Sequence, residues 1–158
     1  MKLTADQIAT LAAEKVLDIG GGVWLTVDLM PDNDLGIADF HDCYGQVAHI
    51  PRGRREDPRP AWFTGSARKI WTHSECFWWQ PPEGISYDLG QLQRTVKDIL
   101  EYGFLTIEVR RWHKCDKCGS DCRDVAYLGG VEPFPTDEAL ADYLPDIVWE
   151  LLHDLAVV

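Results

Sequence analysis

The amino-acid sequence predicts an α+β protein with a mostly antiparallel sheet and three to four helices. Two observations predict this class. Apolar residues recur at helical spacing in three separate segments, which cover both ends of the chain and one central stretch. Between these segments, short runs with alternating or β-branched and aromatic residues are separated by glycine- and proline-containing turns. We expect the strands to pair with their neighbours and the helices to pack on them.

The first helix is expected over residues 5–18. Thr4 and Gln7 have the spacing of a capping box, in which each side chain bonds the other residue's backbone amide. Gly20–Gly22 follows, and a glycine run of this kind is typical of a helix end. The apolar residues at helical spacing in this segment are Ile8, Leu11 and Ala12.

Two further helical regions carry recognisable ends. Asp88 is a predicted N-cap for a second helix, and Gly103 stands where the glycine that follows a helix is expected. Thr136 caps the last helical region, which continues to the C-terminal residues. Pro145 lies inside this region, so it either kinks one helix or begins another.

Strands are predicted wherever alternation or β-branched and aromatic residues dominate between turns. A loop is expected over 51–60, since its three prolines and one glycine oppose regular structure. The predicted strands are 23–29, 37–40, 44–50, 69–80, 104–112 and 123–128. The last two flank residues 115–122, so we expect this segment to form a zinc-knuckle-like tip of a hairpin.

Length and composition predict one α+β domain over residues 1–158, because the sequence shows neither a repeat nor a linker-like break. The formal net charge is −11, which favours basic or mixed protein surfaces as partners and disfavours nucleic acid and anionic lipid. The N-terminal residues lack a signal-like apolar run, and no apolar run has membrane-spanning length, so we expect a cytoplasmic protein.

Three of the five cysteines form a C-x-x-C-G-x-x-C pattern, which is typical of a zinc knuckle in a reducing compartment. Cys115, Cys118 and Cys122 supply three thiolates, and Gly119 permits the positive φ of a tight turn. A structural zinc site needs a fourth ligand, and we favour the segment that contains His73 and Cys76. The candidates for this fourth position are His113, His73, Cys76 and Cys43. The alternative is that the three cysteines are ordinary thiols.

A second pattern resembles the H-x-E and P-C-x-x-C motifs of the zinc-dependent nucleobase deaminases. The resemblance implies that His73, Cys115 and Cys118 bind zinc, while Glu75 transfers protons without binding the metal. Lys114 stands where the family has proline, and the segments around both motifs have the pattern of strands rather than of helices. This resemblance covers seven residues.

Arginines concentrate in the predicted loop, and aromatic residues follow it. These positive charges could bind phosphate or an acidic peptide, or they could lie on the acidic surface of the same chain. Trp78 and Trp79 are adjacent, so in a strand they must point to opposite faces, and a partner or a helix must cover the second face. The predicted partner-binding residues are Arg52, Arg54, Arg55, Arg59, Trp62 and Trp78.

We therefore predict a non-catalytic protein-interaction module or regulator, stabilised by structural zinc, with a homodimer as one form of the interaction. The composition, with many tryptophans and more arginine than lysine, resembles the small accessory proteins of actinobacteria and their phages. That resemblance implies a regulator or inhibitor of a host protein. The alternatives are a zinc-dependent hydrolase or deaminase that uses His73, Glu75, Cys115 and Cys118, and a nucleic-acid binder that uses the arginine loop.

Overall fold

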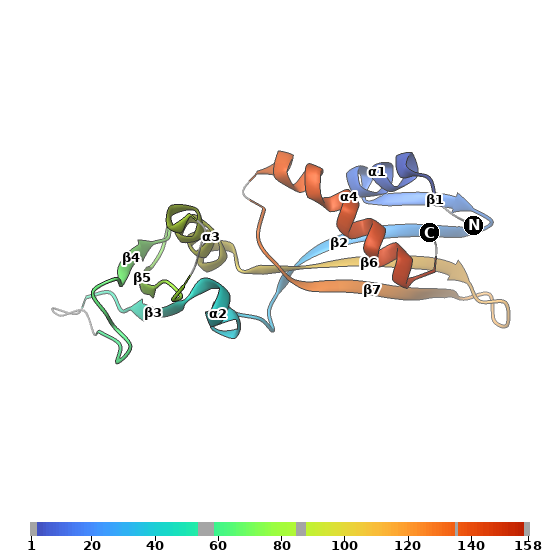
Figure 1. The fold of residues 1–158 in the computed structure, drawn as a ribbon. Coiled ribbons are helices and arrows are strands. Elements are labelled where there is room, and N and C mark those ends of the chain that lie inside the picture. Colours follow the sequence, from blue (N-terminus) through green and yellow to red (C-terminus); the bar gives the residue numbers. More distant parts are fainter. Residues whose placement is uncertain (1–2, 54–58, 85–87, 135, 157–158) are drawn as a thin grey trace. The chain divides into compact units, whose positions relative to one another are not determined.

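A computed structural model describes residues 3–53, 59–84, 88–134 and 136–156. Its helices and antiparallel sheets confirm the predicted α+β class (Figure 1). Contacts within the chain define two compact units. Unit 1 comprises Met1–Asp32 and Leu105–Val158, and unit 2 comprises Asn33–Phe104. Among the described residues, none of the helices has the length and apolar character needed to cross a membrane.

The two units were not separable in the sequence, where one domain over 1–158 was expected. Unit 2 is inserted into unit 1, and the chain leaves unit 1 after Asp32 and re-enters it at Leu105. Both junctions adjoin strand ends and not a long linker, because one strand of unit 1 ends at Asp32 and the next begins at Phe104. The amino-acid composition therefore does not change at either junction, although each unit has its own hydrophobic core.

Unit 1 is a four-stranded sheet with two helices. The strand order is β1-β2-β6-β7, and both hairpins pair antiparallel. Side-chain contacts between the central strands join Asp28 to Arg110 and Thr26 to Trp112, so β2 and β6 also run in opposite directions. The elements are α1 (Ala5–Glu14), β1 (Val16–Gly20), β2 (Val23–Asp32), β6 (Phe104–Lys114), β7 (Asp121–Val131) and α4 (Asp137–Asp154).

The first helix is shorter than the predicted 5–18. The capping box of Thr4 and Gln7 is present, but Lys15 adopts φ 63° and ends the helix, with its backbone N–H on the Leu11 carbonyl at 2.9 Å. The chain then forms β1, which ends at Gly20, and Gly21 and Gly22 make the turn of the β1–β2 hairpin, so the glycine run does not end the helix. The apolar residues Val16, Leu17 and Ile19 fit the end of a helix as well as a strand, so residue type alone does not place the helix end.

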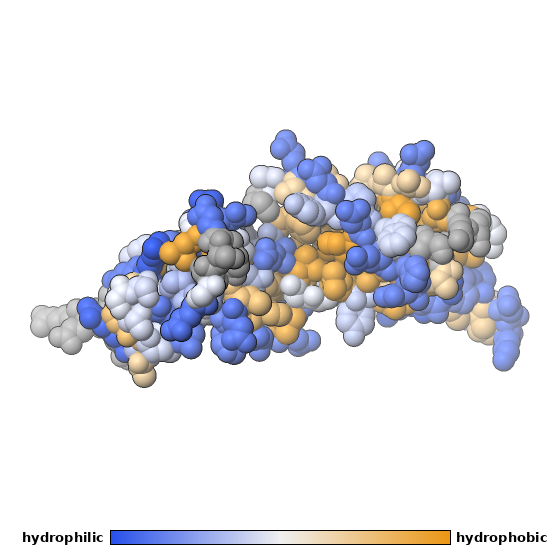
Figure 2. Space-filling model, viewed as in Figure 1, coloured by the Kyte–Doolittle hydropathy of each residue, from blue (hydrophilic) through white to orange (hydrophobic). Residues whose placement is uncertain are grey.

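Both helices of unit 1 cover the same face of the sheet (Figure 1). α4 is one continuous helix that contains Pro145, which resolves the two alternatives left by the sequence. In Figure 2 the visible surface is largely hydrophilic, and hydrophobic colour gathers where α4 crosses the sheet. The buried core residues are Ile8, Leu11, Ala12, Leu25, Val27, Ile107, Val109, Ala126, Leu144, Val148, Leu151, Leu152 and Leu155.

Unit 2 has a three-stranded antiparallel sheet in the order β3-β5-β4. Residues 37–40 form a short 3-10 helix and not the predicted strand. The predicted strand 69–80 is a hairpin, because Thr72 and Glu75 bond across a turn that separates β4 from β5. The elements are η1 (Ile37–Phe40), α2 (His41–Tyr44), β3 (Gln46–Ile50), β4 (Arg68–Trp71), β5 (Cys76–Gln80) and α3 (Leu89–Tyr102).

Both faces of the unit 2 sheet are covered. Trp79 is fully buried against α3 and donates its indole N–H to the Tyr44 carbonyl at 2.7 Å. On the opposite face, Trp62 and Phe63 from the segment before β4 pack on Trp78, whose ring meets that of Phe63 edge-on at 4.9 Å. The prediction that adjacent tryptophans point to opposite faces is confirmed, and the second face is covered by a loop segment of the same chain.

Candidate functional site

The cysteine pattern lies at the tip of the β6–β7 hairpin, as the sequence predicted. The Cys115 backbone N–H donates to the Ser120 carbonyl and the Gly119 N–H donates to the Cys115 carbonyl, each at 2.8 Å. Gly119 has φ 69°, which a residue with a Cβ adopts only with strain, so the expected positive φ is also confirmed. The backbone therefore brings the first and last cysteines of the pattern back toward each other.

The three thiols interact with one another. The Cys115 sulfur accepts hydrogen bonds from the backbone N–H groups of Lys117 and Cys118, then from the thiols of Cys118 and Cys122. These donors lower the pKa of Cys115 to about 7, because each stabilises the thiolate. Burial raises the pKa of Cys122, and the neighbouring charge of Cys115 adds to that effect. The tip thus holds one sulfur that favours the anionic form and two thiols that donate to it.

His113 belongs to the same end of the hairpin. It pairs with Cys122 across the two strands, so both side chains point to the face that carries the helices. The Nδ1 atom of His113 is buried, makes no hydrogen bond within the described part of the chain, and lies 3.9 Å from the Asp124 carboxylate. The sequence left open whether His113 shares a side with the cysteines, and the strand register places it on the same face as Cys122.

The other predicted fourth ligands belong to unit 2. His73 donates its backbone N–H to the Glu101 carboxylate at 2.8 Å, and its Nδ1 contacts the second oxygen of that carboxylate. Cys76 is buried next to Trp78, and Cys43 is exposed in α2. Among the described residues, no group of three or more histidine, cysteine or acidic side chains converges as a metal-binding set.

The residues of the deaminase-like pattern occupy two different hairpins. His73 and Glu75 lie in the turn between β4 and β5, where Glu75 Oε1 is 3.3 Å from His49 Nε2. Cys115 and Cys118 lie in the turn between β6 and β7. Neither motif has the helix that follows it in the deaminase family, since a strand follows each turn. The turn between β4 and β5 therefore holds the contact of Glu75 with His49, and the turn between β6 and β7 holds the thiol cluster.

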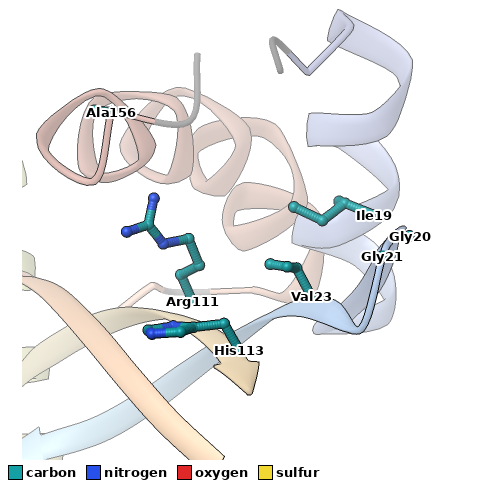
Figure 3. A pocket seen from close by; sticks show the side chains of 7 residues that line it. All are labelled: Ile19, Gly20, Gly21, Val23, Arg111, His113 and Ala156. Atoms are coloured by element: carbon teal, nitrogen blue, oxygen red, sulfur yellow. The ribbon is translucent and has the colours of Figure 1, made fainter. Parts of the chain in front are cut away.

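A cavity of about 500 Å³ lies beside His113 in unit 1. Figure 3 shows Arg111 and His113 projecting from β6 on one side, while Ile19 and Val23 line the other. Arg111 binds the Asp124 carboxylate through two of its nitrogens and donates to the Leu155 carbonyl at 3.1 Å. Its positive charge is thus engaged at the C-terminal end of α4, and the cavity wall is mainly apolar.

The sheet of unit 1 has a second face, opposite α1 and α4, that carries large apolar side chains. Tyr127 is 70 % exposed, Val16 is 52 % exposed and Val125 is 41 % exposed. Trp24 and Trp112 stack on this face with ring centres 6.1 Å apart, and the Trp112 indole N–H donates to Thr26 at 3.1 Å. We call the surface formed by Val16, Trp24, Trp112, Val125 and Tyr127 the aromatic face.

Arg110 and Lys114 on the aromatic face pair with carboxylates, and Arg123 contacts an aromatic ring. Arg110 lies between Asp28 and Glu108, with nitrogen to oxygen distances of 2.6 and 2.5 Å. Lys114 pairs with Asp121 at 2.6 Å. The Arg123 guanidinium lies over the Trp112 ring, 5.7 Å from its centre. This face therefore combines exposed apolar area with locally balanced charge, although the whole chain carries a net charge of −11.

The partner-binding residues predicted from the sequence have contacts inside unit 2. The Arg52 guanidinium contacts the Ser74 carbonyl, and Arg59 lies over the Phe63 ring at 4.8 Å. Trp78 is 9 % exposed, since Trp62 and Phe63 cover it. Arg54 and Arg55 lie outside the described residues. Sequence reasoning did not select the aromatic face, although the alternation of Trp24 with Leu25 and Val27 placed it opposite the core.

No family model matches this chain, and comparisons with curated proteins and with solved structures give no significant match.

Proposed function

We propose that this protein is an interaction module that binds another protein through the aromatic face of unit 1. The observation that carries the proposal is the exposure of Tyr127, Val16 and Val125 beside the stacked pair of tryptophans. Exposed apolar side chains on a sheet face that no helix covers are typical of a protein-binding surface. Tyrosine, tryptophan and arginine are the residues most enriched at the energetic centres of such surfaces.

The charge pattern supports a protein as the partner. Arg110 and Lys114 on this face already pair with carboxylates, so they are poorly placed to neutralise a series of phosphates. A net charge of −11 also repels nucleic acid. A protein partner with a mixed or mildly basic surface needs no series of unpaired cations and is not repelled by the net charge. Its apolar side chains could cover the tyrosine and the valines.

The sheet edge adds a second reason to favour a polypeptide. β7 is the outermost strand of its sheet, and it runs over 11 residues from Asp121 to Val131. An extended segment of a partner could continue the sheet at this edge and place its side chains on the aromatic face. On this reading the module acts as a regulator or inhibitor of the protein that it binds.

Site-specific crosslinking tests the proposal. A photo-reactive phenylalanine analogue at position 127 is irradiated in an extract of the cells that produce the protein, and the adducts are identified by mass spectrometry. The matched control places the analogue at Tyr143, which is 63 % exposed on α4. We expect a discrete adduct at position 127 that is missing at position 143 and that disappears when Val125→Glu is added.

Three outcomes have different meanings. A discrete adduct with another protein supports the proposal, and an adduct with a second copy of this chain assigns the face to a homodimer. Equal patterns at positions 127 and 143, or adducts that survive Val125→Glu, would contradict a specific role for the aromatic face.

A further inference from the structure

We propose that Cys115, Cys118, Cys122 and His113 bind one zinc ion that closes the β6–β7 hairpin. The inference goes beyond the proposed function, because the aromatic face needs no metal to present its side chains. The site would be structural, with four protein ligands and no position left for a substrate.

The backbone of the turn is the first part of the argument. The N–H groups of Lys117 and Cys118 donate to the Cys115 sulfur, so the turn directs two backbone amides at the first of three clustered sulfurs. Gly119 supplies the positive φ that turns the chain after the second cysteine. A hairpin tip that merely reversed the chain would need neither amide at the sulfur.

The position of Cys122 is the second part. Its thiol reaches the Cys115 sulfur from the first residues of β7, and the Cys118 thiol reaches the same sulfur from the turn. In the described structure the Cys118 and Cys122 thiols donate to the Cys115 sulfur, and no set of three such side chains is arranged around a common point. Zinc would replace the thiol hydrogens, whose protons pass to solvent, and small side-chain rotations would bring three sulfurs to one ion.

His113 completes the set. It stands opposite Cys122 in the strand register, so these two side chains share a face of the hairpin, and Cys115 is the first residue after the end of β6. Its buried Nδ1 makes no hydrogen bond to the described residues, while Asp124 lies 3.9 Å away. Histidine ligands commonly donate their second ring N–H to a carboxylate, and Asp124 is placed for that role.

The donor chemistry indicates which ion fits. The cavity wall that carries His113 is otherwise formed by Arg111, Ala156 and the β1–β2 hairpin, so it supplies no further ligand (Figure 3). Three thiolates and one imidazole form a soft, closed donor set, which favours zinc over magnesium or calcium.

Metal content and cobalt substitution test the proposal. The reduced full-length chain is purified without added metal and analysed for zinc, then stripped and titrated with Co²⁺ while the absorption spectrum is recorded. We expect one zinc per chain, and one Co²⁺ that gives the sulfur charge-transfer and visible bands of a tetrahedral site. Cys122→Ser and His113→Ala should each weaken Co²⁺ binding by at least about 100-fold, since each removes a ligand.

The control variant is Cys43→Ser, which changes an exposed cysteine of unit 2 and should leave both the stoichiometry and the spectrum unchanged. X-ray absorption on the unaltered protein guards against variants that fail to fold. Three sulfurs and one nitrogen around zinc are expected. Four sulfurs would overturn the assignment of His113, and a reduced chain that binds neither zinc nor Co²⁺ would overturn the site, while leaving the crosslinking result at position 127 unaffected.

Discussion

The two sheets of this protein treat aromatic side chains in opposite ways. In unit 2 the chain covers both faces, so that Trp79 is 0 % and Trp78 is 9 % exposed. In unit 1 the helices cover one face, and Tyr127 on the other face is 70 % exposed. Aromatic residues on a strand thus do not identify a binding surface by themselves. What decides is whether another segment of the same chain covers them.

The segment that makes the difference is the one before β4. Trp62 and Phe63 lie across Trp78, and the Lys69 ammonium lies 5.0 Å from the centre of its ring. On the aromatic face of unit 1 the corresponding contacts are Arg123 over Trp112 and the stack of the two tryptophans, which leave the outer strand uncovered. The presence of a covering loop therefore distinguishes the core face of unit 2 from the candidate interface of unit 1.

The largest expected effect is at the covered sheet. Trp79→Ala removes a fully buried indole and its bond to Tyr44, and we expect a loss of about 3–5 kcal/mol in the free energy of unfolding of unit 2. Trp71→Ala on β4 is the matched control, since Trp71 is 65 % exposed and its replacement should cost less than about 0.5 kcal/mol. Urea unfolding followed by circular dichroism measures both, and similar losses would show that Trp79 is not a core residue.

A smaller effect separates the two tryptophans of β5 from each other. Trp79→Phe leaves the Tyr44 carbonyl without its donor and should cost about 2 kcal/mol. The Trp78 indole N–H is buried and has no hydrogen bond to the described residues, so Trp78→Phe removes an unsatisfied group and should cost about 1 kcal/mol less. The same unfolding experiment compares the pair, and a Trp78→Phe variant that is the less stable of the two would mean that its indole N–H has an acceptor.

The next prediction concerns the turn between β4 and β5. The backbone N–H of His73 lowers the pKa of Glu101 below its ordinary value of 4.5, with the His73 ring as a further cause. A lowered pKa stabilises the folded state above that ordinary value, and the contribution disappears as the pH falls through the folded pKa. Glu101→Gln should therefore lower the melting temperature at neutral pH and have progressively less effect below pH 4.5.

Glu75→Gln is the control for this pH series. Its carboxylate contacts His49 at 3.3 Å and is 50 % exposed, so the ion pair is screened by water and should contribute little. Melting curves from acidic to neutral pH measure both variants. A difference between Glu101→Gln and the unaltered protein that stayed constant over this range would contradict the coupling of Glu101 to His73.

The fold class was predictable because local signals were consistent with it. Capping residues fixed the starts of three helices, and Gly103 fixed an end. The errors came from segments where two periodicities overlap. Residues 16–20 continued the apolar spacing of α1, and the hairpin of β4 and β5 contained too few turn residues to interrupt an aromatic run. The insertion of unit 2 left no trace, because its junctions adjoin strands.

The candidate site was predictable only where it is local in the sequence. The cysteine turn and the positive φ of Gly119 follow from eight adjacent residues. The relation of His113 to Cys122 depends on strand register, and the exposure of Tyr127 depends on which face the helices cover. Neither can be obtained from residue types, and the partner-binding residues predicted from the sequence therefore all lie in unit 2.

The smallest expected effect on stability carries the most weight for function. Tyr127→Ser changes an exposed side chain of the outermost strand, so the free energy of unfolding should change by less than about 0.5 kcal/mol. If the aromatic face is a binding surface, the same variant should lose most of the crosslinked partner in a competition experiment, because a tyrosine at the centre of an interface often contributes about 2 kcal/mol or more. A core position such as Trp79 cannot show this separation, since its loss unfolds the unit and removes any function with it. If the Tyr127→Ser variant were less stable but captured the partner as before, Tyr127 would contribute to the fold, as the tryptophans of unit 2 do, and not to an interface.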